Sequence, residues 1–565
     1  MKTLQANMVD VVRKKTYPAR IAFDSHIRQI ELLNERIDNR YILPGFVDAH
    51  VHIESSMLPP SEFARIAVRH GTLAAVSDPH EIANVLGIAG IDFMLADSAR
   101  VPFRFVFGAP SCVPATPFES AGAVLASGDM EDLLSNEKIG YLSEMMNFSG
   151  VLQNDPEVMA KIAVARKYGK PIDGHAPGLT GDALKKYVEA GISTDHECTA
   201  FEEAEEKILA GMKILIREGS AAKNFDALYP LIEKYPDRVM LCTDDIHPDD
   251  LLRGHINTLI TRAIAKGIDL FSVLRAATLN PVEHYRIDLG LLQLNDPADF
   301  IVVDNLRHFN VQQCFLRGEC IDACRHSALD AESPGNIGGL RVKSAMTDRE
   351  FAMTDQKPAT TVFPNRFGAS KISASDIQVI ATSGKMKVIQ VFDGDLFTKQ
   401  FFCDVPKGLS VVSDTDSDIL KMVVLNRYQP AKPAVAFIRG FGLKQGALAS
   451  TVAHDSHHIV AVGADDESLV AVINHIIDLK GGLATWYDQH LQRLKLDIAG
   501  LMSSAPVEDV AHACHQLTRI ASQMGSSLTA PFITLSFMAL LVIPELKLGD
   551  KGSFDVGKFE WTELF

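Results

Sequence analysis

The sequence is poor in cysteine and tryptophan, with 8 Cys and 2 Trp among 565 residues. No C-x-x-C pair occurs, and the scattered cysteines indicate a reducing compartment rather than a disulfide framework. They stand at Cys112, Cys198, Cys242, Cys314, Cys320, Cys324, Cys403 and Cys514. The last cluster, Cys314, Cys320 and Cys324 with His326, matches no standard zinc spacing. We therefore expect buried free thiols.

A secretory signal is also missing, because no basic region followed by an apolar stretch opens the chain. The most hydrophobic late segment, from Phe532 to Ile543, lies between Pro531 and Pro544 and is shorter than the ~20 residues that span a bilayer. We expect a cytoplasmic protein. Its net charge of -16, without clustered basic residues, argues against nucleic acid or membrane lipid as a partner and favours a small neutral or cationic substrate.

The remaining composition is that of a globular protein, with 47% hydrophobic and 22% charged residues. A length of 565 residues allows about three domains. From about residue 42 to 285, apolar strands alternate with helical stretches, which is typical of βα units around a parallel sheet. Eight candidate strands end near His50, Ser77, Gly108, Glu144, His175, His196, Arg217 and Asp244. The predicted fold class is α/β, with a (β/α)8 TIM barrel, which typically spans ~250 residues.

The segment Tyr41–Met57, YILPGFVDAHVHIESSM, holds the most informative pair of residues. His50 and His52 are two apart on a predicted strand, so both imidazoles point to the same side. At the C-terminal end of a barrel strand, such a pair predicts half of a metal site. A bare H-x-H is also compatible with two unrelated surface histidines. The longer motif P-G-F-V-D-A-H-V-H resembles the first-strand signature of the amidohydrolase superfamily.

Other strand ends supply further metal-ligand side chains. Metal-dependent hydrolysis needs ligands that hold ions and leave a position for water. Each residue alone could be a packing residue, but together the candidates converge on one end of the barrel. The predicted metal ligands are His50, His52, Glu144, His175, His196 and Asp244. Four imidazoles with two carboxylates suit Zn²⁺, Fe²⁺ or Mn²⁺.

The resemblance narrows to the bacterial adenine deaminases over the barrel and the C-terminal region. It rests on the runs HVHIESSMLPPSEFARIAVRHGT, SDPHEIANVLGI, SEMMNFSGVL, DGHAPGLTG, REGSAAKN, CTDDIHPDDL and GFGLKQGALASTVAHDSHHIVAVGADD. It implies hydrolysis of adenine to hypoxanthine and ammonia, two divalent ions per chain (Mn²⁺ or Fe²⁺, with Zn²⁺ as an alternative) and a homo-oligomer. The H-x-E and P-C-x-x-C signature of the cytidine-deaminase fold is absent from the sequence.

The same resemblance implies roles for individual residues. His50, His52 and Asp244 would hold one ion, and His175 and His196 the other. Glu144 would bridge the two ions, as a carboxylated lysine does in many amidohydrolases. Asp244 and Glu144 are the predicted catalytic residues, with Asp244 accepting a proton from the attacking hydroxide and delivering it to the purine or the departing amine.

Six further residues are predicted to bind the substrate: Asp78, His80, Glu81, Arg217, His454 and His457. Alternatives stay open for several of them. Ser77 and Asp78 could instead cap the next helix. Arg217 could contact a ring nitrogen or pair with a carboxylate. The segment from Thr451 to Ile459 could be a solvated turn, or a lid that contacts substrate or an extra metal.

The domain organisation follows from the barrel and the resemblance. Amidohydrolases build a small β-sandwich from segments before and after the barrel, which here implies residues 1–43 and 286–334. Residues 44–285 would form the catalytic barrel and 335–565 a C-terminal α+β domain over the active site. Two other functions compete: an amidohydrolase acting on another cyclic amide or N-acyl substrate, and a metal-binding scaffold without catalysis. The downstream run GFGLKQGALASTVAHDSHH argues against the first, and the complete ligand set against the second.

Overall fold

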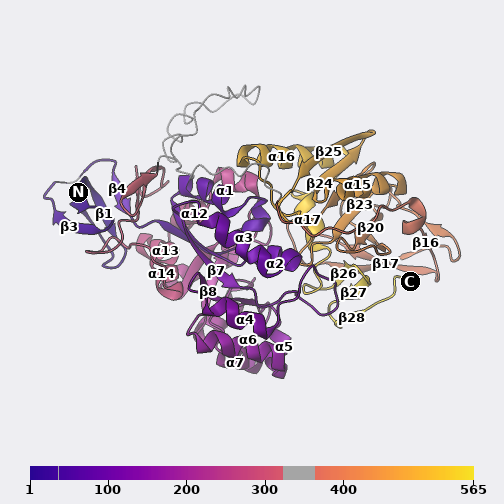
Figure 1. The fold of residues 1–565 in the computed structure, drawn as a ribbon, viewed down its shortest axis with the longest axis horizontal. Helices are drawn as coiled ribbons and strands as arrows, with labels where there is room; N and C mark the ends of the chain where they lie inside the picture. Colours follow the sequence, from indigo (N-terminus) through magenta and orange to yellow (C-terminus); the bar gives the residue numbers. More distant parts are fainter. Residues whose placement is uncertain (36, 322–362) are drawn as a thin grey trace.

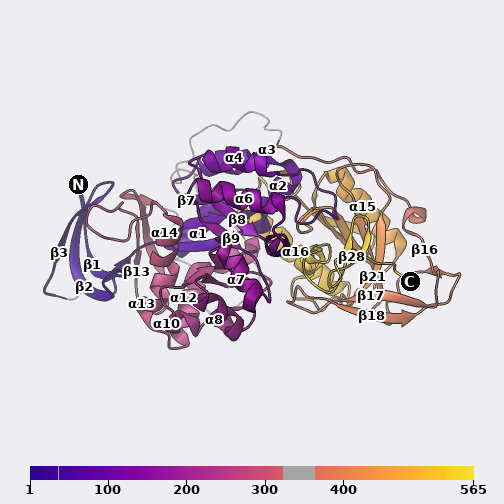
Figure 2. The same cartoon turned by 90° about the horizontal axis from the view of Figure 1, so that it is seen from below.

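Three bodies lie in a row along the long axis of the molecule (Figure 1). The structure is a computed structural model and describes residues 1–35, 37–321 and 363–565. An N-terminal sheet occupies one end, a barrel the middle and a mixed domain the other end, and a view turned by 90° shows the same order (Figure 2). Among the described residues, no helix has the length and apolar character that crossing a membrane requires.

The N-terminal body is one curled seven-stranded sheet. Its order is β15-β14-β13-β4-β1-β2-β3. Segments before and after the barrel therefore pair directly, as when Ile42 of β4 pairs with Val302 of β13. Phe23 of β2 packs edge-on against Phe300 of β13 at 5.2 Å, although two strands separate them in the sheet, so the sheet closes over its own core. The predicted sandwich thus takes the form of one continuous sheet. Its strands are β1 (Lys2–Asp10), β2 (Lys15–Phe23), β3 (Ile27–Leu32), β4 (Tyr41–Leu43), β13 (Phe300–Val303), β14 (Val311–Leu316) and β15 (Glu319–Ile321).

Eight parallel strands form the central barrel. They are β5 (Phe46–Val51), β6 (Thr72–Ser77), β7 (Arg104–Ala109), β8 (Ile139–Met145), β9 (Ile172–Gly174), β10 (Thr194–Asp195), β11 (Lys213–Arg217) and β12 (Val239–Cys242). Most are buried on both faces, as expected for a sheet surrounded by helices. Each ends within about two residues of its predicted position. The first and last strands meet where the Asp244 amide donates to the His50 carbonyl at 2.9 Å and the His52 amide to the Asp244 carbonyl at 3.0 Å.

Helices surround the barrel on its outer side. They are α1 (Pro60–Ala67), α2 (His80–Leu86), α3 (Ile88–Ser98), α4 (Ser127–Ser135), α5 (Phe148–Gln153), α6 (Pro156–Lys167), α7 (Gly181–Glu189), α8 (Phe201–Leu209), α9 (Phe225–Leu228), α10 (Leu231–Lys234), α11 (Pro248–Arg253), α12 (Ile256–Ala265), α13 (Leu270–Ala277) and α14 (Leu279–Tyr285). Short 3₁₀ turns η1 (Ile53–Ser56) and η2 (Val68–His70) accompany the first βα unit. Alternation of strand and helix therefore extends over the predicted region.

The C-terminal body has an eight-stranded sheet in the order β18-β17-β21-β20-β23-β22-β24-β25. Its strands are β17 (Lys385–Gln390), β18 (Lys399–Asp404), β20 (Leu420–Leu425), β21 (Ala434–Arg439), β22 (Ala447–Ser450), β23 (Ile459–Gly463), β24 (Gly482–Tyr487) and β25 (His490–Lys495). The helices are α15 (Asp466–Leu479), α16 (Val507–Gln523) and α17 (Pro531–Phe537), with the turn η4 (Ala374–Ile377). Smaller pairings involve β16 (Val379–Ile380), β19 (Ser410–Val411), β26 (Leu546–Gly549), β27 (Gly552–Asp555) and β28 (Glu560–Trp561). The C-terminal body thus contains both helices and sheets, as the predicted α+β domain requires.

The predicted domain limits stay predictions. The boundary at 334 and 335 falls within 322–362, outside the described residues, as do Cys324 and His326. Of the other two cysteines in that cluster, Cys314 is buried and Cys320 half-buried, and neither forms a disulfide among the described residues.

Candidate active site

The ends of β5 and β12 bring three predicted ligands together. His50 and His52 have their Nε2 atoms 3.2 Å apart. Asp244 Oδ1 lies 3.4 Å from the His50 nitrogen and 3.1 Å from the His52 nitrogen. Asp244 has a backbone φ of 59°, in the left-handed region that few non-glycine residues adopt. The backbone bonds that close the barrel hold it there.

Glu144, at the end of β8, connects the two halves of the histidine set. Its Oε1 lies 3.3 Å from His52 Nε2. Its Oε2 lies 2.7 Å from His175 Nδ1 and 3.3 Å from His196 Nε2. One carboxylate therefore presents one oxygen to the β5 histidines and the other to the histidines after β9 and β10.

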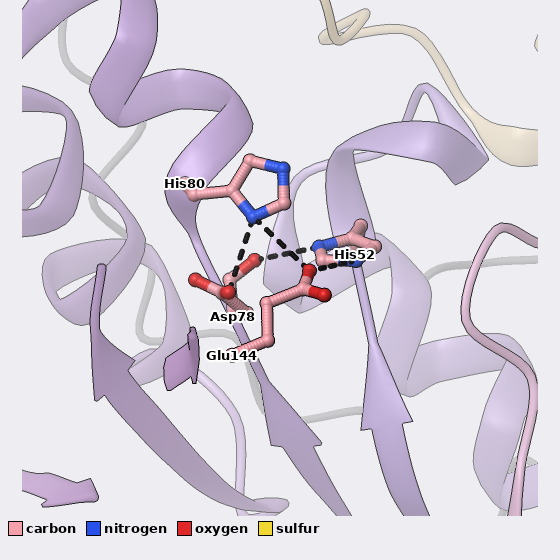
Figure 3. A group of neighbouring side chains, drawn as sticks. All are labelled: His52, Asp78, His80 and Glu144. Carbon is pink, nitrogen blue, oxygen red and sulfur yellow. Dashed lines mark hydrogen bonds and ion pairs between the residues drawn. The ribbon is translucent and has the colours of Figure 1, made fainter. Parts of the chain in front are cut away.

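Asp78 and His80 extend this cluster on the side of β6 (Figure 3). His80 Nδ1 lies 3.1 Å from Asp78 Oδ2 and 3.5 Å from Glu144 Oε1, while the Asp78 carbonyl faces His52 Nδ1 at 3.1 Å. The alternative that Ser77 or Asp78 caps α2 is wrong, since Pro79 occupies the N-cap position without a side-chain bond.

Glu81 is held by the C-terminal domain. His454 Nδ1 contacts one of its carboxylate oxygens and His457 Nε2 the other. The His457 Nδ1 accepts the Ala453 amide at 3.2 Å, so its Nε2 carries the proton that bonds Glu81. All residues from 454 to 458 are at most 5% exposed, which excludes a solvated turn.

Arg217, after β11, pairs with carboxylates. Its Nη1 donates to Asp244 Oδ2 at 2.7 Å and also to Glu197 Oε1, and its Nη2 donates to Glu197 Oε2 at 3.3 Å. Burial alone would lower the pKa of this guanidinium, but Glu197 and Asp244 raise it above its usual value. Of the two alternatives for Arg217, the carboxylate pairing is present, and contact with a purine stays a prediction.

The two carboxylates of this cluster carry the charge that cation binding needs. Burial opposes ionisation of Glu144 and Asp244, yet His175 beside the first and Arg217 beside the second hold their pKa values well below the usual range. Both carboxylates are therefore anionic at neutral pH. Burial lowers the pKa of His50. Burial also opposes protonation of His52, His175 and His196, but the neighbouring carboxylates raise the pKa of these three imidazoles, so binding of a cation would release protons from them.

Buried ion pairs and hydrogen bonds fix the strand ends that carry the predicted ligands. Lys207 of α8 is fully buried and donates to Asp195 Oδ2 at 2.8 Å and to the Ala176 carbonyl at 2.7 Å. These acceptors adjoin His196 and His175 in sequence. On the other side, Asp48 accepts from the Thr243 amide at 3.0 Å and lies 2.9 Å from His255 Nε2, which ties β5 to β12.

Sequence reasoning missed Glu197 and an apolar wall, and it included Asp455 only as part of the predicted lid segment. Glu197 directly follows His196, and this adjacency was the available signal. The apolar wall belongs to the C-terminal domain. The sequence held no signal for its position, because only folding brings it to the barrel. A cavity lies between these two parts. Its barrel side is lined by His52, His80, Glu81, Glu144, Met146, His175, His196, Glu197, Arg217, Asp244 and Asp245. Its other side is lined by Leu396, His454, Asp455, Phe537, Leu540, Val542 and Ile543 of the C-terminal domain.

Comparison with known proteins matches both parts of this site. Residues 41–321 match the Amidohydrolase family, and residues 395–560 match the Adenine deaminase C-terminal domain. A protein of Methanosarcina mazei called adenine deaminase is 51% identical over 100% of both chains. The chain belongs to the adenine deaminase family.

Other adenine deaminase relatives cover the chain equally well. The Salinibacter ruber protein is 49% identical over 100% of this chain and 99% of its own length. The Borreliella burgdorferi protein is 44% identical over 98% of each chain. As a family member with an amidohydrolase barrel, the protein is a metal-dependent hydrolase, and its buried His, Asp and Glu clusters are of the kind that bind divalent metal.

Proposed function

We propose that this protein hydrolyses the 6-amino group of adenine to give hypoxanthine and ammonia. One observation carries the choice of substrate: the cavity wall comes from residues within 395–560, the segment that matches the adenine deaminase C-terminal domain. The barrel supplies the hydrolytic groups, and this domain completes the space around the purine.

Two divalent ions would complete the site, with His50, His52 and Asp244 holding one, and His175 and His196 the other. Ligand atoms bound to one ion at ~2.0–2.2 Å lie roughly 2.8–3.6 Å apart. The His50, His52 and Asp244 donor atoms are separated by 3.1–3.4 Å, which fits. Glu144 would bridge, since its two oxygens face different histidine pairs. The donor set suits Mn²⁺ or Fe²⁺, with Zn²⁺ as an alternative.

Bound divalent ions lower the pKa of water and so supply a nucleophile at neutral pH. The Asp244 carboxylate, whose Oδ1 faces His50 and His52, would take a proton from the attacking water and then pass it to a purine nitrogen or the leaving amine. Arg217 fixes Oδ2 of the same carboxylate, so that Oδ1 keeps its direction throughout.

The purine would lie between polar groups of the barrel and the apolar wall. His80 Nε2, which lies 3.5 Å from Glu81 Oε1 and 3.7 Å from Asp455 Oδ1, would face a purine edge. Glu81 would lie beside His80 at the same purine edge. Asp78 holds the other nitrogen of His80, and His454 and His457 fix the orientation of the Glu81 carboxylate. Phe537, which stacks on His454 at 4.5 Å, would contact the ring face.

The test is ammonia release by metal-loaded protein from adenine, adenosine and dihydroorotate. We expect rapid release from adenine alone, together with about two ions per chain by elemental analysis. Turnover of dihydroorotate without turnover of adenine would favour the competing amidohydrolase function. The homo-oligomer and the cytoplasmic location stay predictions.

A further inference from the structure

Glu197 lies in the cavity but has no part in the ligand set argued above. It follows β10 directly after His196 and is 7% exposed. A buried carboxylate needs compensation, and Arg217 is already shared between Glu197 and Asp244. One guanidinium therefore faces two carboxylates, and His175 and His196 also lie beside Glu197.

The direction of the carboxylate indicates where compensation comes from. Glu197 Oε1 lies 3.2 Å from His196 Nε2 and 3.7 Å from His175 Nδ1. These separations are close to the roughly 2.8–3.6 Å expected for ligand atoms around one ion. Glu197 Oε1 thus lies near His175 Nδ1 and His196 Nε2, the nitrogens of the two histidines proposed to hold the second ion.

With Glu197 included, each half of the centre has two imidazoles and one carboxylate of its own. In the first half, Asp244 Oδ1 lies 3.4 and 3.1 Å from the nitrogens of His50 and His52. In the second half, Glu197 Oε1 lies 3.7 Å from His175 Nδ1 and 3.2 Å from His196 Nε2. This oxygen also accepts from Arg217, whereas Asp244 accepts from Arg217 on Oδ2. Arg217 Nη1 donates to both carboxylates, so one side chain positions the acid of each half.

We propose that Glu197 is a ligand of the second divalent ion and that Arg217 couples it to Asp244. The inference rests on the proposed two-ion centre. Each ion would then receive two imidazoles and one carboxylate oxygen of its own, and both would share Glu144. The second ion would then have a ligand besides His175, His196 and the shared Glu144.

The experiment measures Mn²⁺ binding to metal-free protein by equilibrium dialysis, without substrate. In Glu197→Gln, we expect the first ion to bind as in the parent and the second at least ~10-fold more weakly, because losing even a group that only supports a ligand costs ~10–100-fold. Glu81→Gln is the matched control, because it removes the same charge from the same cavity, and it should keep both ions.

Arg217→Met separates ligation from ion pairing. If Glu197 only neutralises Arg217, Glu197→Gln should keep two ions at parental affinity, and this result would overturn the proposal. A crystal structure of zinc-loaded parent protein with Glu197 Oε1 beyond the coordination distance of ~2.0–2.2 Å would overturn it as well. With Glu197 as a ligand, Arg217→Met retains both ions, whereas Glu197→Gln does not.

Failure of the proposed function gives a different result. Parent protein that binds two ions but releases no ammonia from adenine would reject the adenine activity and leave the ligand assignment standing. Parent protein that deaminates adenine while Glu197→Gln binds both ions normally would reject the ligand assignment alone.

Discussion

The barrel side and the C-terminal side of the cavity differ in chemistry. The barrel contributes His52, His80, His175 and His196 and the carboxylates Glu144, Glu197 and Asp244, all at or just beyond strand ends. The C-terminal domain contributes mainly apolar groups from α17 and the loop after it, with His454 and Asp455. Strand ends are rigid, because neighbouring strands and buried ion pairs such as Lys207 with Asp195 fix them.

This difference indicates a division of labour. Groups that hold ions and move protons need positions fixed within fractions of an ångström, which a closed sheet provides. Enclosing a flat, largely apolar substrate needs surface area and exclusion of water, which a second domain can supply. Barrel substitutions should therefore change metal content or kcat, and substitutions in the C-terminal wall should change KM.

The largest effect is expected for Asp244→Asn on the barrel side. Asparagine keeps the shape and one oxygen donor but cannot accept a proton, so turnover should fall by ~10²–10⁴-fold while most of the metal is retained. Steady-state kinetics and elemental analysis on the same preparation measure both. Near-parental turnover would remove Asp244 from proton transfer, and loss of metal would show that its main task is ligation.

Glu144→Gln should lower metal content and activity together. A neutral amide is a poor bridge between two cations, and both Glu144 oxygens face histidine nitrogens. We expect fewer than two ions per chain and a fall in turnover that excess Mn²⁺ partly restores. Unchanged metal content and unchanged rate would exclude the bridging role.

On the C-terminal side, Phe537→Ala should raise KM for adenine by roughly 3- to 10-fold, since an aromatic contact is worth about 0.5–1.5 kcal/mol. Metal content should not change, because Phe537 touches no predicted ligand. Phe401→Ala, which alters a 37% exposed ring in the same domain, is the control and should be silent. A Phe537 variant with parental KM but reduced metal would contradict the division between the two sides.

The smallest expected effect is on the pH dependence of stability, at the contact between the barrel and the C-terminal domain. Burial, and then Asp455 and Asp550 of the C-terminal domain, raise the pKa of Glu119 on the barrel loop to about 8. The protonated Glu119 carboxyl therefore contributes to the free energy of unfolding. This contribution is fully present below the ordinary carboxyl pKa and is lost as the pH rises through about 8.

Glu119→Gln stays neutral, so its Tm should fall less than that of the parent between pH 6 and pH 9. The gap should be roughly 2–4 °C for each kcal/mol of lost stability. Thermal unfolding at the two pH values measures it. Parallel Tm values for parent and variant would show that Glu119 does not ionise at the junction.

Much of the barrel side could be predicted from the sequence. Apolar strands of a parallel sheet are continuous local runs, and the chemistry stands where each run ends, as with Glu144 after Ile139–Leu142. The period of two along a strand places His50 and His52 on one side without any tertiary information. The same local pattern yielded the strands and helices of the C-terminal domain.

What the sequence could not decide was which residues meet across long separations. The apolar run from Phe532 to Ile543 was visible as hydrophobic and too short for a membrane, but its place at the cavity depends on how the C-terminal sheet packs on the barrel. The bonds from His454 and His457 to Glu81 join residues more than 370 positions apart. Glu197 was adjacent to a predicted ligand, yet only the position of Arg217 and the turn after β10 direct its carboxylate toward two histidines. Local periodicity thus determined the elements and the barrel's strand-end residues, whereas long-range packing, which no local pattern encodes, decided the enclosure and the partners of each charge.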